Sequence, residues 1–253
     1  MFGYRDLIFT LCIHRLKVRY SQSALGWLWA VLQPLALMLI YTVIFSLVTK
    51  IPSGGVPYAL FVYSALLPWT YFSTILNTAA GSLVKHTNLI TKVYFPREIL
   101  PITYIVVGLF DFCVASVFLG GMMVYYKAHP NVTVWWAIPC MLILTGFGGA
   151  VALVFSALEV RFRDVGLAMP LIVQVWMFAT PVVYPLSAVP ARFHNIYVLN
   201  PLTGAIENFR RALLGNEPID FVSLKASAII TAIVLPLAYL FFKHREASMA
   251  DII

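Results

Sequence analysis

Three basic side chains, Arg15, Lys17 and Arg19, lie close together near the start of the chain. Guanidinium and ammonium groups hold phosphate through charge-assisted hydrogen bonds, so this segment could bind anionic headgroups at a membrane surface. Trp27 and Trp29 follow, and indole rings favour the interface between membrane and water. The alternative is that these cations only set the orientation of the chain in the membrane.

Motifs for catalysis or nucleotide binding are absent from the sequence. It contains no Gly-x-x-x-x-Gly-Lys-Ser/Thr, His-Glu-x-x-His, Gly-x-Ser-x-Gly or Cys-x-x-Cys. The histidines are scattered, so we predict no metal site. Cys12, Cys113 and Cys140 lie among apolar residues and are expected to be reduced packing residues. We expect a chain that is not an enzyme and carries no cofactor.

The composition indicates a protein embedded in a membrane. Of 253 residues, 61% are hydrophobic and 11% charged, and the mean hydropathy is +0.89. Soluble domains carry about 25% charged residues. The net charge of +7 would suggest nucleic acid as a partner in a soluble protein. Here the excess cations are interpreted as topology signals and contacts to membrane lipids, and no nucleic acid is expected.

Six apolar segments are each close to the ~20 residues that a helix needs to cross a bilayer. They cover about 27–48, 58–83, 101–126, 135–158, 165–184 and 221–242. We therefore predict an all-α membrane protein with six transmembrane helices in one domain, 1–253. Glycines at 120–121 and 146–149 predict close packing between helices.

The distribution of cations predicts that both termini are cytoplasmic, because cytoplasmic segments carry an excess of Lys and Arg. With that orientation, eleven cations lie inside: Arg5, Arg15, Lys17, Arg19, Lys85, Lys92, Arg97, Arg161, Arg163, Lys243 and Arg245. Six lie outside: Lys50, Lys127, Arg192, Arg210, Arg211 and Lys225.

Two segments outside the predicted spans have a mixed character. Residues 1–26 predict a cytoplasmic helix along the membrane surface, with its cations directed to headgroups or solvent. Residues 185–220 are too polar to span and too apolar for a free loop, so we predict short re-entrant helices on the external side. One of these should cover Leu202–Leu214 and end at Gly215. Within the spans, Asp111 is expected to form a hydrogen bond to a neighbouring helix.

The cytoplasmic loop at residues 84–100 predicts a binding surface for another protein. The loop mixes cations with apolar and aromatic side chains that are expected to be exposed: Leu89, Ile90, Val93, Tyr94 and Phe95. A short helix that docks into a groove of a partner needs such a surface, whereas a simple linker does not. The alternative is packing at the membrane interface.

Aromatic residues make up 15% of the chain. Rings stack on the C–H faces of sugars, so rings that line a path could let a glycan slide. The candidates for such a lining are Tyr41, Phe45, Trp69, Tyr71, Trp176, Phe178 and Tyr184. The alternatives are the aromatic belt of a membrane protein or its core.

Several short motifs occur in order along nearly the whole chain. They are Arg19-Tyr20-Ser21, Leu25-Gly-Trp-Leu-Trp-Ala-Val-Leu-Gln-Pro34, Leu67-Pro-Trp-Thr-Tyr-Phe72, Asn88-Leu-Ile-Thr-Lys-Val-Tyr-Phe-Pro96, Arg161-Phe-Arg-Asp-Val165, Thr180-Pro181 and Asn200-Pro201. In this order and spacing the chain resembles permease subunits of type-2 ABC exporters. It is most similar to the branch that exports O-antigen, teichoic acid and capsule polysaccharides.

The resemblance implies a permease in the bacterial cytoplasmic membrane that pairs with a second copy of itself. A separate ABC ATPase subunit would bind ATP and Mg²⁺ and drive export of a glycan linked to a lipid, expected to be a polyprenyl diphosphate. The residues implied for ATPase docking are Lys85, His86, Asn88, Leu89, Ile90, Lys92, Tyr94, Phe95, Pro96, Arg161, Arg163 and Asp164. The candidates for the lipid headgroup are Arg15, Lys17, Arg19 and Tyr20. Arg210 and Arg211 would lie near external headgroups or the exit of the path.

Three other functions compete with this one. The same family includes exporters of drugs or small lipophiles, whose path needs no room for a polymer. An intramembrane enzyme would need His and carboxylate residues that converge at one depth, and the sequence offers few. A purely structural membrane protein would not need the docking surface at residues 84–100.

Overall fold

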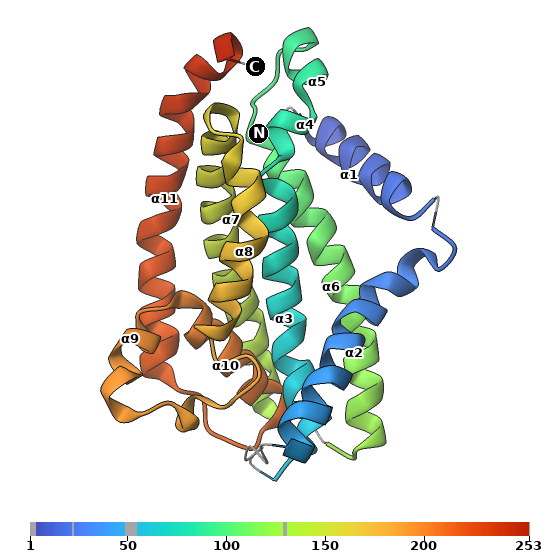
Figure 1. Ribbon diagram of the computed structural model, residues 1–253, viewed down its shortest axis with the longest axis vertical. Coiled ribbons are helices and arrows are strands. Elements are labelled where there is room, and N and C mark those ends of the chain that lie inside the picture. The colour runs from blue at the N-terminus through green and yellow to red at the C-terminus, as the bar shows by residue number, and fades with distance from the viewer. Residues whose placement is uncertain (1–3, 22, 49–54, 129–130, 253) are drawn as a thin grey trace.

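The computed structural model describes residues 4–21, 23–48, 55–128 and 131–252, and these ranges form a helical bundle without strands (Figure 1). Residues 49–54, between the first two predicted spans, lie outside the described residues, as do residues 1–3 and 22 of the predicted interface segment. The long helices are α1 (Arg5–Tyr20), α2 (Trp29–Thr42), α3 (Tyr58–Ala79), α6 (Ile99–Tyr125), α7 (Ala137–Arg161), α8 (Asp164–Phe178), α10 (Pro201–Leu214) and α11 (Phe221–Ile252).

Five segments of the described chain are long and apolar enough to cross a membrane, which confirms five of the six predicted spans. They are Gly26–Phe45, Tyr58–Ala79, Ile99–Tyr125, Val132–Arg161 and Phe221–Glu246. The predicted span 165–184 is shorter in the structure, where α8 has 15 residues and ends at Phe178. Pro181 explains the early end, because a proline disfavours helical backbone at the residue before it. At 1.5 Å per residue α8 is about 22 Å long.

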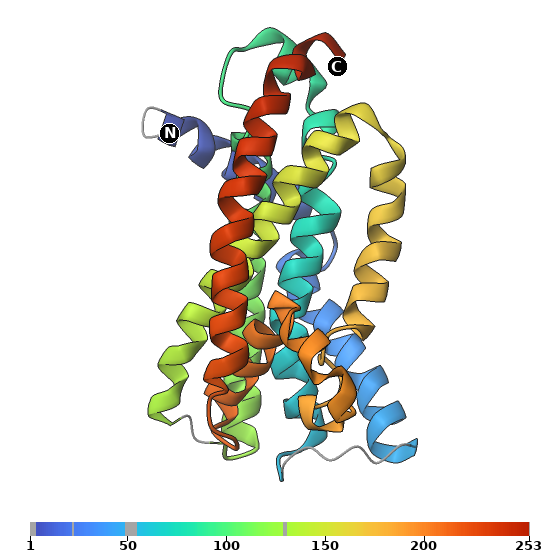
Figure 2. The same cartoon turned by 90° about the vertical axis from the view of Figure 1, so that its left-hand side faces the viewer.

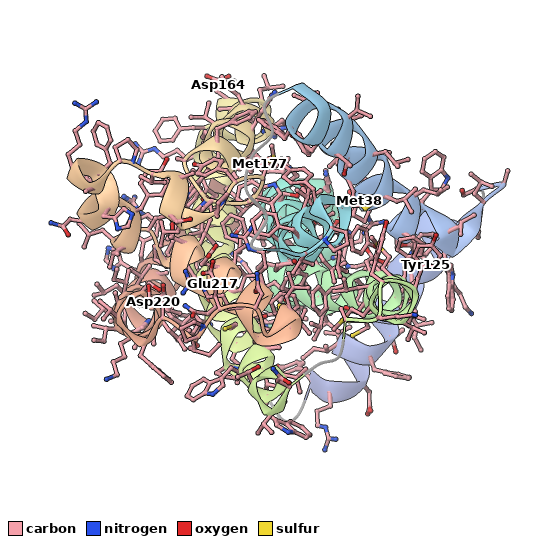
Figure 3. The ribbon with its side chains drawn as sticks, turned by 90° about the horizontal axis from the view of Figure 1, so that it is seen from below. Met38, Tyr125, Asp164, Met177, Glu217 and Asp220 are labelled. Carbon is pink, nitrogen blue, oxygen red and sulfur yellow. The ribbon has the colours of Figure 1, made fainter. Side chains whose placement is uncertain are left out.

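Helix α3 lies at the centre of the bundle. Seen along the long axis, α2, α6, α7, α8 and α10 surround it (Figure 3). Its side chains are buried on nearly every face, including Tyr63, Trp69 and Phe72. The α2 segment, in contrast, contributes few buried residues and exposes Trp29, Leu39 and Val43.

Small residues let α7 pack closely on its neighbours, as predicted. A β-carbon added at Gly146 would lie 3.1 Å from Thr231 of α11, and one at Gly148 would lie 3.2 Å from Phe72 of α3. The same prediction is wrong for Gly120 and Gly121 of α6 within this chain, because no atom lies within 4 Å of a β-carbon added there. Neither of these two glycines meets a neighbouring helix of the described chain.

Helix α10 confirms the helix predicted at Leu202–Leu214, and it is buried at the end of the bundle opposite α5 (Figures 1 and 2). The side chain of Asn200 accepts a hydrogen bond from the backbone N–H of Leu202 and caps the first turn, followed by Pro201. Gly215 ends the helix in the left-handed region at φ 62°, where glycine pays no steric cost. Asn208 then binds the start of α11 through Asp220 and Ser223.

Gly204→Ala should destabilise the fold, because a β-carbon at Gly204 would overlap the carbonyl oxygen of Ser223 and the hydroxyl of Ser227 on α11. We expect a loss of about 1–3 kcal/mol, typical of an overpacked core, measured as thermal unfolding in detergent. Gly121→Ala is the matched control and should unfold at or above the wild-type temperature. Equal unfolding temperatures for Gly204→Ala and the wild type would contradict the close contact between α10 and α11.

Candidate functional site

One end of the bundle gathers the predicted docking residues. Two short helices, α4 (Ser82–Lys85) and α5 (Thr87–Lys92), connect α3 to α6 there, together with the ends of α7 and α11 (Figure 1). The exposed members are Lys85, Asn88, Lys92 and Tyr94, and on the turn between α7 and α8 Arg161, Arg163 and Asp164. His86 and Pro96 are half-buried. The structure therefore brings two segments separated by about 70 residues to one face, which we call the α5 face.

The prediction that all apolar residues of this loop are exposed is wrong. Phe95 is buried at 5% exposure, and Leu89 and Ile90 pack partly against the same hydrophobic cluster. Tyr94, in contrast, is 96% exposed. The chain leaves α5 with an extended backbone at Val93, and in the irregular residues that follow Phe95 lies inside the bundle while Tyr94 faces solvent. Burial also lowers the pKa of His86 on this face.

A buried carboxylate that was not among the predicted docking residues lies behind the α5 face. Glu159 of α7 is 9% exposed, and its Oε2 atom has no hydrogen-bond partner. Gly166 of α8 leaves room for it, since a β-carbon there would lie 2.7 Å from Oε1. Lys85 and Arg163 line the same cavity of about 240 Å³. The sequence shows that Glu159 lies close to Arg161 and Arg163. It does not show that the carboxylate is buried.

Helix α1 carries the predicted headgroup residues, and it runs obliquely along α6 rather than away from the bundle (Figures 1 and 2). The prediction that its cations face headgroups or solvent is wrong for Arg15. This side chain is 9% exposed, and its guanidinium carbon lies 3.5 Å from the ring centre of Tyr104 on α6. Burial lowers the pKa of Arg15.

The end of α1 is attached to the middle of α6 by an ion pair. Arg19 Nη1 lies 2.7 Å from Asp111 Oδ2, and the Tyr20 hydroxyl donates a hydrogen bond to the other oxygen of Asp111. This confirms the prediction that Asp111 binds a neighbouring helix. Burial and the contact with Asp111 raise the pKa of Tyr20. Arg19 and Tyr20 are thus already engaged within the chain.

Lys17 is oriented differently from the other two cations. It is exposed, and no ion pair of its side chain occurs among the described residues. It lies beside a groove of about 430 Å³ between α1 and the start of the first span. The groove is lined by Ile13, Leu16, Lys17, Tyr20, Ser21, Gly26 and Trp27. An apolar chain with an anionic head has the chemistry that fits this groove.

Comparisons with known proteins identify the family. The model of the ABC-2 type transporter family matches residues 6–214. The chain belongs to the ABC-2 family. It is 31% identical to the O-antigen export system permease protein RfbA of Myxococcus xanthus, over 99% of this chain and 96% of that protein. It is 30% identical to RfbA of Klebsiella pneumoniae over 87% of this chain and 85% of that protein, and 23% identical to the polysialic acid transport protein KpsM of Escherichia coli over 94% and 93%.

Membership of the ABC-2 family makes this chain a multi-pass membrane permease. The matched range covers α1 to α10 and thus includes the α5 face, the α1 groove and the buried α10. Within the described residues, no three His, Cys, Asp or Glu side chains are grouped so that they could hold a metal ion.

The aromatic residues of this ABC-2 permease fall into two groups. Trp69 and Tyr71 are buried inside the bundle at 3% and 2% exposure, which places them in the core. The others lie on or near α2 and α8 and are half-buried or exposed: Tyr41, Phe45, Trp176, Phe178 and Tyr184. The Tyr41 hydroxyl of α2 donates a hydrogen bond of 3.8 Å to the sulfur atom of Met177 on α8, so α2 and α8 are in contact at this point (Figure 3).

Two further expectations are corrected by the structure. Arg210 does not face external headgroups: it is 1% exposed, pairs with Glu207 and lies 3.9 Å from the ring centre of Phe61. Arg211 pairs with Glu207 and Glu217. Of the cysteines, Cys12 and Cys140 are buried and free as predicted, whereas Cys113 is exposed on α6.

Asp111→Ala should loosen α1, because it leaves the Arg19 guanidinium and the Tyr20 hydroxyl without their shared acceptor. We expect a loss of about 1–3 kcal/mol in the local stability of α1, measured as faster hydrogen exchange of residues 5–20. Asp111→Asn keeps an acceptor for Tyr20 and should lose less. Wild-type exchange of α1 in Asp111→Ala would show that other contacts hold this helix.

Proposed function

We propose that this chain is the membrane subunit of an ATP-driven exporter that moves a lipid-linked polysaccharide outward across the bacterial inner membrane. The observation that carries the proposal is the similarity to an O-antigen export permease over 99% of the chain. Similarity to a polysialic acid transport protein points to the same class of substrate. Since the sequence has no P-loop, ATP hydrolysis is assigned to a separate subunit.

The ATPase subunit binds to the α5 face, which lies on the cytoplasmic side in this proposal. The exposed ring of Tyr94 and the exposed Arg161 and Arg163 support this, because aromatic residues and arginine are enriched in protein interfaces. The two segments of the face, residues 85–96 and 161–164, would move together when ATP closes the ATPase subunits. Such a rigid-body motion would open a path through the membrane.

A second copy of the chain binds at the face formed by α2 and α8. Both helices expose large apolar side chains there, such as Leu39 and Ile40 on α2 and Leu171 and Val175 on α8. The half-buried aromatic residues of α2 and α8 lie on or beside this face. A path between the two copies would therefore be partly lined by rings, on which sugars stack without strong polar contacts.

Lys17 is the cation that we assign to the anionic headgroup of the lipid carrier, expected to be a polyprenyl diphosphate. It is exposed at the mouth of a groove with mainly apolar residues, whereas Arg15 is buried and Arg19 is paired with Asp111. A polyprenyl chain would lie against the apolar residues of the groove, and its diphosphate would bind the ammonium group of Lys17. The cation of Lys17 would hold the substrate before it enters the path.

The function is tested in a bacterium that carries this gene. Its deletion should abolish polysaccharide at the cell surface and cause lipid-linked polysaccharide to accumulate inside, and the wild-type gene should restore export. The Lys17→Glu variant should restore only about a tenth of the export that the wild-type gene restores, because its carboxylate repels the diphosphate. Arg5→Glu, an exposed position on the same helix, is the control and should restore it fully.

Unchanged surface polysaccharide in the deletion strain would contradict the function, and export of a small lipophile alone would assign the chain to the other branch of the family. Full export with Lys17→Glu would contradict only the headgroup assignment.

Tyr94→Ala should weaken binding of the ATPase subunit about tenfold, since large exposed rings at an interface carry much of the binding free energy. The measurement is titration of the purified permease in nanodiscs with its ATPase subunit. Tyr125→Ala is the control, because Tyr125 is 80% exposed at the opposite end of α6. Equal affinities for Tyr94→Ala and Tyr125→Ala would exclude the α5 face as the docking site.

A further inference from the structure

The C-terminal end of α11 contacts the segment that leads from α5 into α6. We predicted from hydropathy that the last span ends near residue 242, but α11 continues to Ile252. Its side chains Lys243 and Glu246 form one wall of a groove of about 720 Å³, and residues 90–97 form the other. This wall of the groove lies outside the range that the family model matches.

Glu246 binds the backbone directly before α6. Its Oε1 atom accepts a hydrogen bond of 2.9 Å from the backbone N–H of Arg97, and its backbone carbonyl accepts one of 2.6 Å from Arg97 Nη1. A carboxylate near the start of a helix interacts favourably with the helix dipole. Glu246 therefore fixes Arg97, the second residue before α6, from a distant part of the chain.

Lys243 connects the same carboxylate to a second one. Its Nζ atom lies 2.7 Å from Glu246 Oε2 and 2.8 Å from Glu98 Oε2. The side chain of Glu98 is 4% exposed, so its charge needs a partner, and Lys243 provides it. These contacts fix α11 to both residues that precede α6.

An apolar layer supports the ion pairs from below. Phe95, Phe242 and Met249 are all buried in one cluster, together with Leu83 at the start of α4. Because Phe95 is held inside this cluster and Arg97 is held by Glu246, the residues between α5 and α6 have a defined position. Tyr94 points to solvent as a result.

We propose that Glu246 and Lys243 are positioning residues that hold residues 93–97 in the conformation to which the ATPase subunit binds. This inference rests on the proposed function, and it assigns a coupling role to the C-terminal end of α11. The groove beside the two residues lets the partner reach Tyr94 and Lys92 from the side of α11.

The test uses the full-length permease in nanodiscs with its ATPase subunit. In Glu246→Ala, hydrogen exchange of residues 93–97 should accelerate and the affinity for the ATPase subunit should fall about tenfold, as expected for the loss of a charged hydrogen bond. The KM for ATP should stay unchanged, because the nucleotide binds elsewhere. Glu246→Gln keeps the acceptor for Arg97 and should regain most of the protection and affinity.

Asp6→Asn is the matched control, because it neutralises an exposed carboxylate on α1, and it should behave like the wild type. Unchanged exchange of residues 93–97 in Glu246→Ala would overturn the proposal, and so would faster exchange with unchanged affinity. Should Glu246→Ala fail to fold, Lys243→Gln takes its place with the same expected result. Failure of the docking assignment itself is recognised separately, by an unchanged affinity in Tyr94→Ala.

Discussion

Charged groups surrounded by apolar residues must be paired, and in this chain the pairs hold the outer elements on the bundle. Asp111 holds the end of α1 through Arg19. Glu98 holds the end of α11 through Lys243. Arg210 pairs with Glu207 of its own helix and reaches the carbonyl of Val182, which fixes α10 between α3 and the segment after α8. Helices that hydrophobic packing alone would leave free to slide are thereby fixed in register.

Buried α10 shows how a polar segment can occupy a place inside a membrane protein. Backbone groups at that depth need hydrogen-bond partners, which the helix itself provides, and its ends are closed by Asn200 and Gly215. The side chain of Asn208 on α10 accepts a hydrogen bond from the backbone N–H of Asp220 and donates one to the hydroxyl of Ser223, at the start of α11. The end of the bundle opposite α5 is therefore filled by the buried α10.

Much of the fold could be predicted from the sequence, because hydropathy and local signals depend on neighbouring residues. The apolar spans, the end of α10 at Gly215 and the helical N-terminal segment were all recognisable in this way. The site was harder to predict, because a residue's burial depends on partners far away in the sequence. The sequence around Phe95 is typical of an exposed loop, but Phe95 is buried because Phe242 and Met249 of α11 pack in the same cluster. Nothing in the polar sequence after residue 242 indicates that Lys243 and Glu246 form one wall of the groove beside residues 90–97.

Helix α11 is continuous from Phe221 to Ile252, so it is about 48 Å long and joins α10 at one end to the α5 face at the other. A continuous helix acts as a lever: a tilt imposed at Glu246 displaces the contacts of Ser223 and Ser227 with α10 unless the helix bends. The position where a bend costs least is set by Pro236, whose ring removes the hydrogen bond to the carbonyl of Ala232. The stiffness at Pro236 thus decides how much of a displacement at Glu246 reaches the contacts with α10.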